Sequence, residues 1–73
     1  MSEATATRPV KKGHGGPYDR GAADYYYWRP RRPHFNDDNH RRVTEKDMTP
    51  EEISAYHAGY DKAEEFGDRK DFD

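Results

Sequence analysis

Apolar side chains recur at steps of three and four along residues 50–66, where Ile53, Tyr56, Tyr60 and Ala63 fall on one stripe. This spacing is typical of a helix that buries one face and leaves the other in water. The pattern therefore predicts a helix over residues 50–66.

The ends of that helix carry their own signals. Thr49 is placed to be the N-cap, Pro50 suits the first helical position, and Glu52 completes a capping box. Gly67 follows Phe66 as a natural C-terminal stop.

An earlier stripe runs through Tyr18, Ala22, Tyr25 and Arg29. The three consecutive tyrosines at 25–27 would also suit a strand, but the Asp-Arg-Gly-Ala-Ala-Asp stretch before them favours a helix over residues 18–28. Proline at 30 and 33 ends this element, because proline lacks an amide donor and biases the preceding residue to extended geometry.

These elements predict an all-α fold, a small two-helix hairpin within residues 17–67 whose long linker, residues 29–42, is rich in arginine and proline. Residues 1–16 are polar and end in glycines, so we expect a disordered N-terminal tail. Residues 68–73 form a short charged C-terminal tail.

The composition limits the core that these helices can share. The chain has 73 residues and no leucine, and the AVILMFWYC set is only 30%, whereas aromatic residues reach 14%. Large aromatic side chains can hold a minimal core together. A domain of this size usually needs a disulfide, a metal or a partner, and cysteine is absent, so a partner is the expected source of extra stability.

The two helices share a Tyr-x-x-Gly pattern, at Tyr18–Gly21 and again at Tyr56–Gly59. Glycine inside a helix costs about 1 kcal/mol relative to alanine, so its presence in both suggests a close approach in which the backbone of one helix lies near an aromatic ring of the other. The expected helix-packing residues are Tyr18, Gly21, Ala22, Ile53, Tyr56, Gly59, Tyr60 and Ala63.

Charge divides along the chain. Residues 1–42 carry nine Lys/Arg against five Asp/Glu, whereas residues 43–73 carry four against ten. Such asymmetry is common in interaction proteins and lets the two halves attract each other. No apolar run is long enough to cross a membrane and no signal peptide is evident, so a cytoplasmic protein is expected.

The stretches Gly15-Gly16-Pro17-Tyr18-Asp19-Arg20-Gly21-Ala22-Ala23-Asp24, Ala55-Tyr56-His57-Ala58-Gly59-Tyr60 and Gly67-Asp68-Arg69-Lys70-Asp71 resemble small proteins of tailed phages. Over residues 17–67 the spacing is also similar to the ribosome modulation factor family, two-helix proteins that bind ribosomal RNA. That family is strongly basic, whereas the second helix and tail here are acidic. The resemblance implies a phage accessory protein that acts in the host cytoplasm on ribosomal or other RNA, as part of host takeover.

Four consecutive aromatic residues, 25–28, are followed closely by arginines at the end of the first helix. Unpaired bases stack on aromatic faces, and guanidinium groups both stack and pair with phosphates, which single-stranded RNA recognition requires. With a pI near 6.1, RNA affinity should be moderate and salt-dependent. The candidate RNA- or partner-binding residues are Tyr25, Tyr26, Tyr27, Trp28, Arg29, Arg31, Arg32, Arg41 and Arg42.

Two other interpretations of these residues stay open. The rings can form the core while the arginines pair with acids of the second helix, such as Glu64 and Glu65. An exposed aromatic beside arginines is also a good protein-binding site, as in an inhibitor or adaptor of a host protein. An alternative acidic partner surface comprises Asp61, Glu64, Glu65 and Asp68.

Catalysis is not expected. The chain has no cysteine, no serine with a local base and no glycine-rich phosphate loop. His34 and His40 flank two aspartates, but zinc sites use tighter spacings and usually cysteine. We therefore expect a non-enzymatic protein with no metal, cofactor, membrane contact or small-molecule substrate. The identity of the partner and the oligomeric state stay open.

Overall fold

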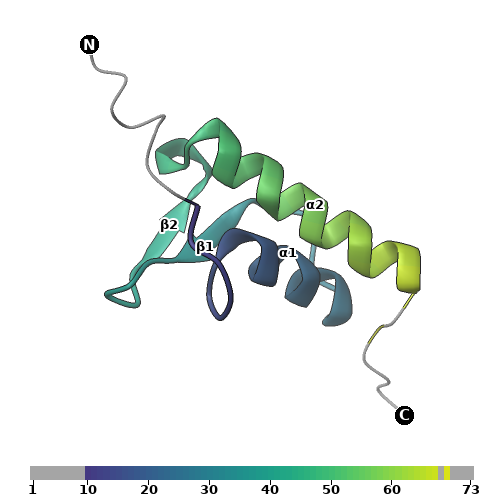
Figure 1. Cartoon of the computed structure of the whole chain (residues 1–73). Coiled ribbons are helices and arrows are strands. Elements are labelled where there is room, and N and C mark those ends of the chain that lie inside the picture. The colour runs from purple at the N-terminus through teal and green to yellow at the C-terminus, as the bar shows by residue number, and fades with distance from the viewer. Residues whose placement is uncertain (1–9, 68, 70–73) are drawn as a thin grey trace.

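A computed structural model describes residues 10–67 and 69 of the chain. Within these residues the element order is α1 (Pro17–Tyr26), β1 (His34–Asn36), β2 (Arg42–Thr44), a single 3-10 turn η2 (Glu45–Asp47) and α2 (Pro50–Phe66). Figure 1 shows the helices side by side, with the strands beside their N-terminal ends.

The predicted all-α class is wrong, because the chain is a small α+β domain. The linker between the helices contains an antiparallel two-stranded sheet whose register pairs Phe35 with Val43. Each strand has three residues with one apolar side chain at its centre. So short a stretch shows too little alternation for the period of a strand to be recognised from sequence.

The helices also do not form a hairpin. Both begin at the end of the molecule that carries the sheet and run in the same general direction (Figure 1). Residues that line the same surface hollows support this parallel direction. Tyr18 at the start of α1 shares one hollow with Ala55, and Tyr26 at the end of α1 shares another with Phe66. Two parallel helices need a connection that returns along the domain, and the linker with its two strands provides it.

The turn between the strands explains why they pair. The Asp37 amide donates to the Arg41 carbonyl and the His40 amide donates to the Asp37 carbonyl, while His40 adopts a left-handed φ of 64°. This is a three-residue hairpin loop, a type I turn followed by a left-handed residue. The Asp37 side chain also accepts from the amides of Asn39 and Arg41, both at 2.9 Å. These bonds, the one from Arg41 foremost, hold the pKa of Asp37 below its ordinary value.

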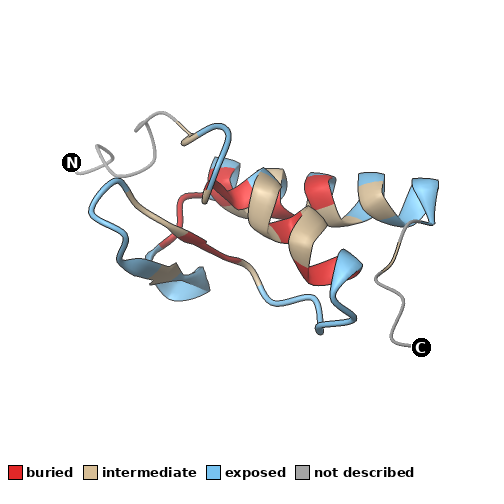
Figure 2. Ribbon diagram, turned by 90° about the horizontal axis from the view of Figure 1, so that it is seen from below, coloured by how far each residue is buried: buried red, intermediate tan, exposed pale blue. Residues whose placement is uncertain are grey.

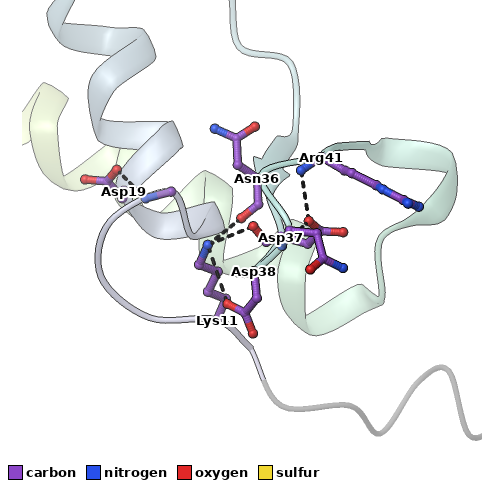
Figure 3. A network of polar contacts seen from close by, with 8 residues as sticks. Lys11, Asp19, Asn36, Asp37, Asp38 and Arg41 are labelled. Atoms are coloured by element: carbon purple, nitrogen blue, oxygen red, sulfur yellow. Dashed lines mark hydrogen bonds and ion pairs between the residues drawn. The ribbon is translucent and has the colours of Figure 1, made fainter.

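Residues 10–16, within the predicted tail, lie against this hairpin (Figure 3). The Lys11 ammonium donates to the Asn36 carbonyl at 2.8 Å and to the Asp37 carbonyl at 3.2 Å. The Gly15 amide donates to the Asp19 carboxylate at 3.0 Å, which joins the same segment to α1. Residues 1–9 of the predicted tail, and all of residues 68–73 except Arg69, lie outside the described residues.

The predicted bounds of the second helix are confirmed. The Thr49 hydroxyl accepts from the Glu52 amide at 3.2 Å, and the Glu52 carboxylate accepts from the Thr49 amide at 2.8 Å. Gly67 ends the helix in a left-handed conformation with φ 68°. The first helix begins at Pro17 and ends at Tyr26, two residues before the predicted end, for a reason given below.

The two glycines lie where the helices cross. A Cβ added at Gly21 would stand 2.0 Å from the Tyr56 carbonyl oxygen, and one added at Gly59 would stand 2.1 Å from the Tyr18 carbonyl oxygen. The backbone carbonyl of the tyrosine in each Tyr-x-x-Gly repeat thus lies against the glycine of the other repeat. The approach is to backbone rather than to an aromatic ring, and only hydrogen at the α-carbon leaves room for it.

The core is small and largely aromatic. Phe35, Met48 and Tyr56 are buried together, and Val43, Ile53 and Tyr60 pack against them. Figure 2 shows the buried residues along β1 and on the helix faces turned toward each other. The sheet therefore supplies part of the core that the helices alone lack.

Candidate nucleic-acid interface

The predicted aromatic patch divides between the core and the surface. Tyr25 is buried and meets Tyr60 edge to face, with ring centroids 5.5 Å apart. Tyr26 and Tyr27 are exposed and pack against each other at 4.9 Å, and Trp28 is 55% exposed. Three of the four rings are therefore at least partly exposed at the end of α1.

The conformation of Trp28 ends the helix. Its amide donates to the Tyr25 carbonyl and the Arg29 amide donates to the Asp24 carbonyl, which together form a Schellman motif. Trp28 occupies the left-handed position of that motif, with φ 64°, where glycine is the usual residue. A side chain there costs about 1–2 kcal/mol. Trp28 is more than half exposed although its position strains the backbone, which makes the residue a candidate for binding.

Arg31 is committed to the fold. Its guanidinium donates to Asp61 at 2.6 Å and to His57 Nδ1 at 3.1 Å, and lies 4.3 Å from the centre of the Tyr60 ring. A carboxylate oxygen of Glu64 lies 3.8 Å away. For Arg31, pairing with acids of the second helix is therefore the interpretation that the contacts support.

The same contacts reduce the predicted acidic surface. Asp61 and Glu64 face Arg31, and Glu65 lies 3.6 Å from the Lys62 ammonium. Asp68 lies outside the described residues. The described acids of this surface are each next to a cation, which weakens the case for a basic partner there.

Other arginines surround a pocket between the end of α1 and the sheet. Its volume is 300 Å³. We call it the arginine pocket, and its lining residues are Asp24, Arg29, Pro30, Arg32, His34 and Arg42. Arg41 is exposed at the hairpin turn and is not among them.

Asp24 lies at the base of the arginine pocket, and its side chain is only 3% exposed. The Tyr56 hydroxyl donates to Asp24 and accepts from the Arg32 amide at 3.0 Å. Burial, and then the hydrogen bond to the carboxylate, raise the pKa of Tyr56 above its ordinary value. His34 Nδ1 donates to the Arg32 carbonyl at 2.9 Å and lies 3.6 Å from the same carboxylate.

This network holds the backbone of Arg32 while leaving its side chain at the surface. The Arg29 guanidinium lies 3.5 Å from Asp24 and 5.1 Å from the centre of the Tyr27 ring. Three arginines against one aspartate leave the pocket a net charge of +2 when His34 is neutral. A cationic pocket of guanidinium groups beside exposed rings suits a phosphate joined to an unpaired base.

A second hollow is bordered mainly by residues of the two helices. It is an apolar groove of 410 Å³ between α1 and α2, with Ala22, Gly59 and Ala63 among the small residues that line it. The aromatic residues that line it are Tyr18, Tyr26, Tyr27 and Phe66. Several predicted helix-packing residues thus also border a surface.

Three residues of the interface were not predicted. Asp24 and His34 meet only because the linker returns past α1, and no spacing in the sequence signals that contact. Arg69 lies over the rings of Tyr25 and Trp28, at 4.0 Å from each centre.

Over the described part of the chain, no group of three metal-ligating side chains is assembled, and no helix is long and apolar enough to cross a membrane. Comparisons of the chain with protein families, with curated proteins and with solved structures found no significant match.

Proposed function

We propose that this protein is a non-enzymatic phage accessory protein that binds single-stranded RNA in the host cytoplasm. The observation that carries the proposal is the arginine pocket, which is bordered by Arg29, Arg32 and Arg42. Arg29 directly follows the exposed Trp28 in the sequence. The pocket takes phosphate groups of the RNA backbone, and the exposed rings of Tyr27 and Trp28 take unpaired bases.

Each contact has an expected weight. Base stacking on an aromatic ring contributes about 1–3 kcal/mol per base. When the logarithm of the binding constant is plotted against the logarithm of the salt concentration, each neutralised phosphate contributes about −0.7 to the slope. Because the interface is small, we expect moderate affinity that falls as salt rises.

The similarity to ribosome modulation factor makes ribosomal RNA the first RNA to test. The site proposed here is assembled from the end of α1 and the sheet rather than from the whole basic half of the chain. Arg31 is left out of it, because its guanidinium already binds Asp61.

The neighbours Arg41 and Arg42 allow a matched test. Both are exposed and carry the same charge, but only Arg42 lines the pocket. We expect Arg42→Ala to weaken binding of a fluorescently labelled single-stranded RNA about tenfold in an anisotropy titration, as loss of a charge-assisted contact implies. Arg41→Ala should change it about twofold or less. Equal losses in the two variants would show that only overall charge matters, and no loss in either would refute the site.

The apolar groove favours a second candidate, an adaptor that binds an apolar segment of a host protein. Phe66 on its rim is 72% exposed. A pull-down from bacterial lysate, with and without ribonuclease, separates the candidates. A host protein that stays bound after nuclease, is lost with Phe66→Ser and is kept with Arg42→Ala would support the adaptor and contradict the RNA proposal.

A further inference from the structure

Arg69 covers two aromatic rings next to the proposed RNA interface. Its guanidinium carbon lies 4.0 Å from the ring centres of both Tyr25 and Trp28. Tyr25 also makes an edge-to-face contact with Tyr60. The two rings thus bind the flat, delocalised guanidinium group of Arg69. Aromatic side chains also bind nucleobases, which are flat and delocalised too.

The hold on Arg69 is incomplete. Its Nε is buried and has no hydrogen-bond partner within the described residues. A buried N–H group without a partner is unfavourable, so the ring contacts are partly offset. A ligand that stacks on the rings and lets Arg69 return to water removes that cost.

The connection to α2 permits such an exchange. Arg69 is two residues beyond Gly67, which is left-handed and has open space where a side chain would be. Glycine has the widest backbone freedom of any residue, so we expect the chain to be able to rotate at this position. Arg69 can leave the rings without disturbing α2.

We propose that the faces of Tyr25 and Trp28 are a stacking site for one unpaired nucleobase, and that Arg69 occupies this site until RNA displaces it. The inference rests on the proposed RNA binding and names one subsite of it. Arg29 follows Trp28 directly in the chain and lines the arginine pocket, so we expect the phosphate attached to the stacked base to bind at the pocket. The positive pocket favours a nucleotide over the arginine of a partner protein, which it would repel.

Trp28 is the one tryptophan of the chain, so its fluorescence reports the site directly. The full chain is titrated with a short oligoadenylate and with an abasic oligomer of the same length. The variants are Arg69→Ala, Arg69→Lys and, as a charge control, Lys62→Ala. Circular dichroism checks that each is folded.

Removal of Arg69 lowers the positive charge, so simple electrostatics predicts weaker binding. The stacking site predicts the opposite, an affinity of Arg69→Ala for oligoadenylate about twofold to fivefold higher, the worth of one exposed cation–π contact. Oligoadenylate binding should quench the fluorescence of Trp28. The affinity of Arg69→Ala for the abasic oligomer should be no higher than that of the wild type. Arg69→Lys should bind at about the wild-type level, and Lys62→Ala should bind no more tightly than wild type.

Four results would overturn the inference. If RNA binds without quenching Trp28, or if Arg69→Ala binds no better than wild type, the stacking site is wrong while RNA binding stands. If an arginine-rich peptide quenches Arg69→Ala and oligoadenylate does not, the site takes a guanidinium from a protein. If no variant binds RNA at all, the proposed function fails together with the inference.

Discussion

The crossing of α1 and α2 depends on Gly59, and a single added methyl group tests it. In Gly59→Ala the new Cβ would stand 2.1 Å from the Tyr18 carbonyl oxygen and 2.9 Å from the carbonyl carbon. Both atoms belong to the backbone of α1, so no side chain can rotate away. The helices must separate by about 1.3 Å to reach the ordinary contact distance of 3.4 Å.

Two effects of opposite sign decide the outcome. Alanine is favoured over glycine in a helix by about 1 kcal/mol. Overpacking a tight contact costs about 1–3 kcal/mol, and occasionally more. Because the contact is with rigid backbone, we expect the overpacking cost to be about 3 kcal/mol or more. After the gain of about 1 kcal/mol from helix propensity, the free energy of unfolding should fall by about 2 kcal/mol. For a domain of this size that corresponds to a fall in Tm of about 8–16 °C.

Urea and thermal unfolding, followed by circular dichroism, measure the change. Ala58→Gly is the matched control, because Ala58 is the exposed neighbour on the same helix and its exchange reports propensity alone. Gly21→Ala should behave like Gly59→Ala, since its Cβ meets the Tyr56 carbonyl oxygen. The double variant should lose less than the sum, because helices already separated accommodate the second methyl group. A Gly59→Ala protein as stable as wild type would refute the close crossing.

Two further predictions concern Trp28 and Tyr56. The free energy of unfolding of Trp28→Gly should be about 1 kcal/mol higher than that of Trp28→Ala, because both lose the indole and only alanine keeps a side chain at φ 64°. Both variants should bind RNA more weakly than the wild type. Equal stabilities of the two variants would contradict the strained turn. The pKa of Tyr56 is raised in the folded chain above its ordinary value of 10.0, so its contribution to stability is complete below about pH 10 and is lost as pH rises beyond that. Absorbance at 295 nm should show a tyrosine ionisation that occurs only with unfolding, and Tyr56→Phe should remove that step; a Tyr56→Phe protein whose absorbance change at high pH matches that of the wild type would contradict the buried hydrogen bond to Asp24.

The sequence alone determined the second helix, because its signals are local. The capping box joins residues three apart, and Gly67 stops the helix through its own backbone conformation. The Tyr-x-x-Gly repeats likewise indicated a close helix contact. The end of α1 was predicted less well, since a left-handed Trp28 is a poor match to the glycine that usually marks such a turn.

Only the tertiary structure decided the rest. Three-residue strands carry no readable period, so the sheet, and with it the parallel course of the helices, emerges from pairing across the hairpin turn. Arg31 and Arg32 are adjacent and alike in sequence, yet one is bound to α2 and the other borders the pocket. Asp24, His34 and Arg69 reach the interface through returns of the chain that depend on the packed core. These contacts are fixed by the packing of the whole domain, and no local pattern around Asp24, His34 or Arg69 encodes them.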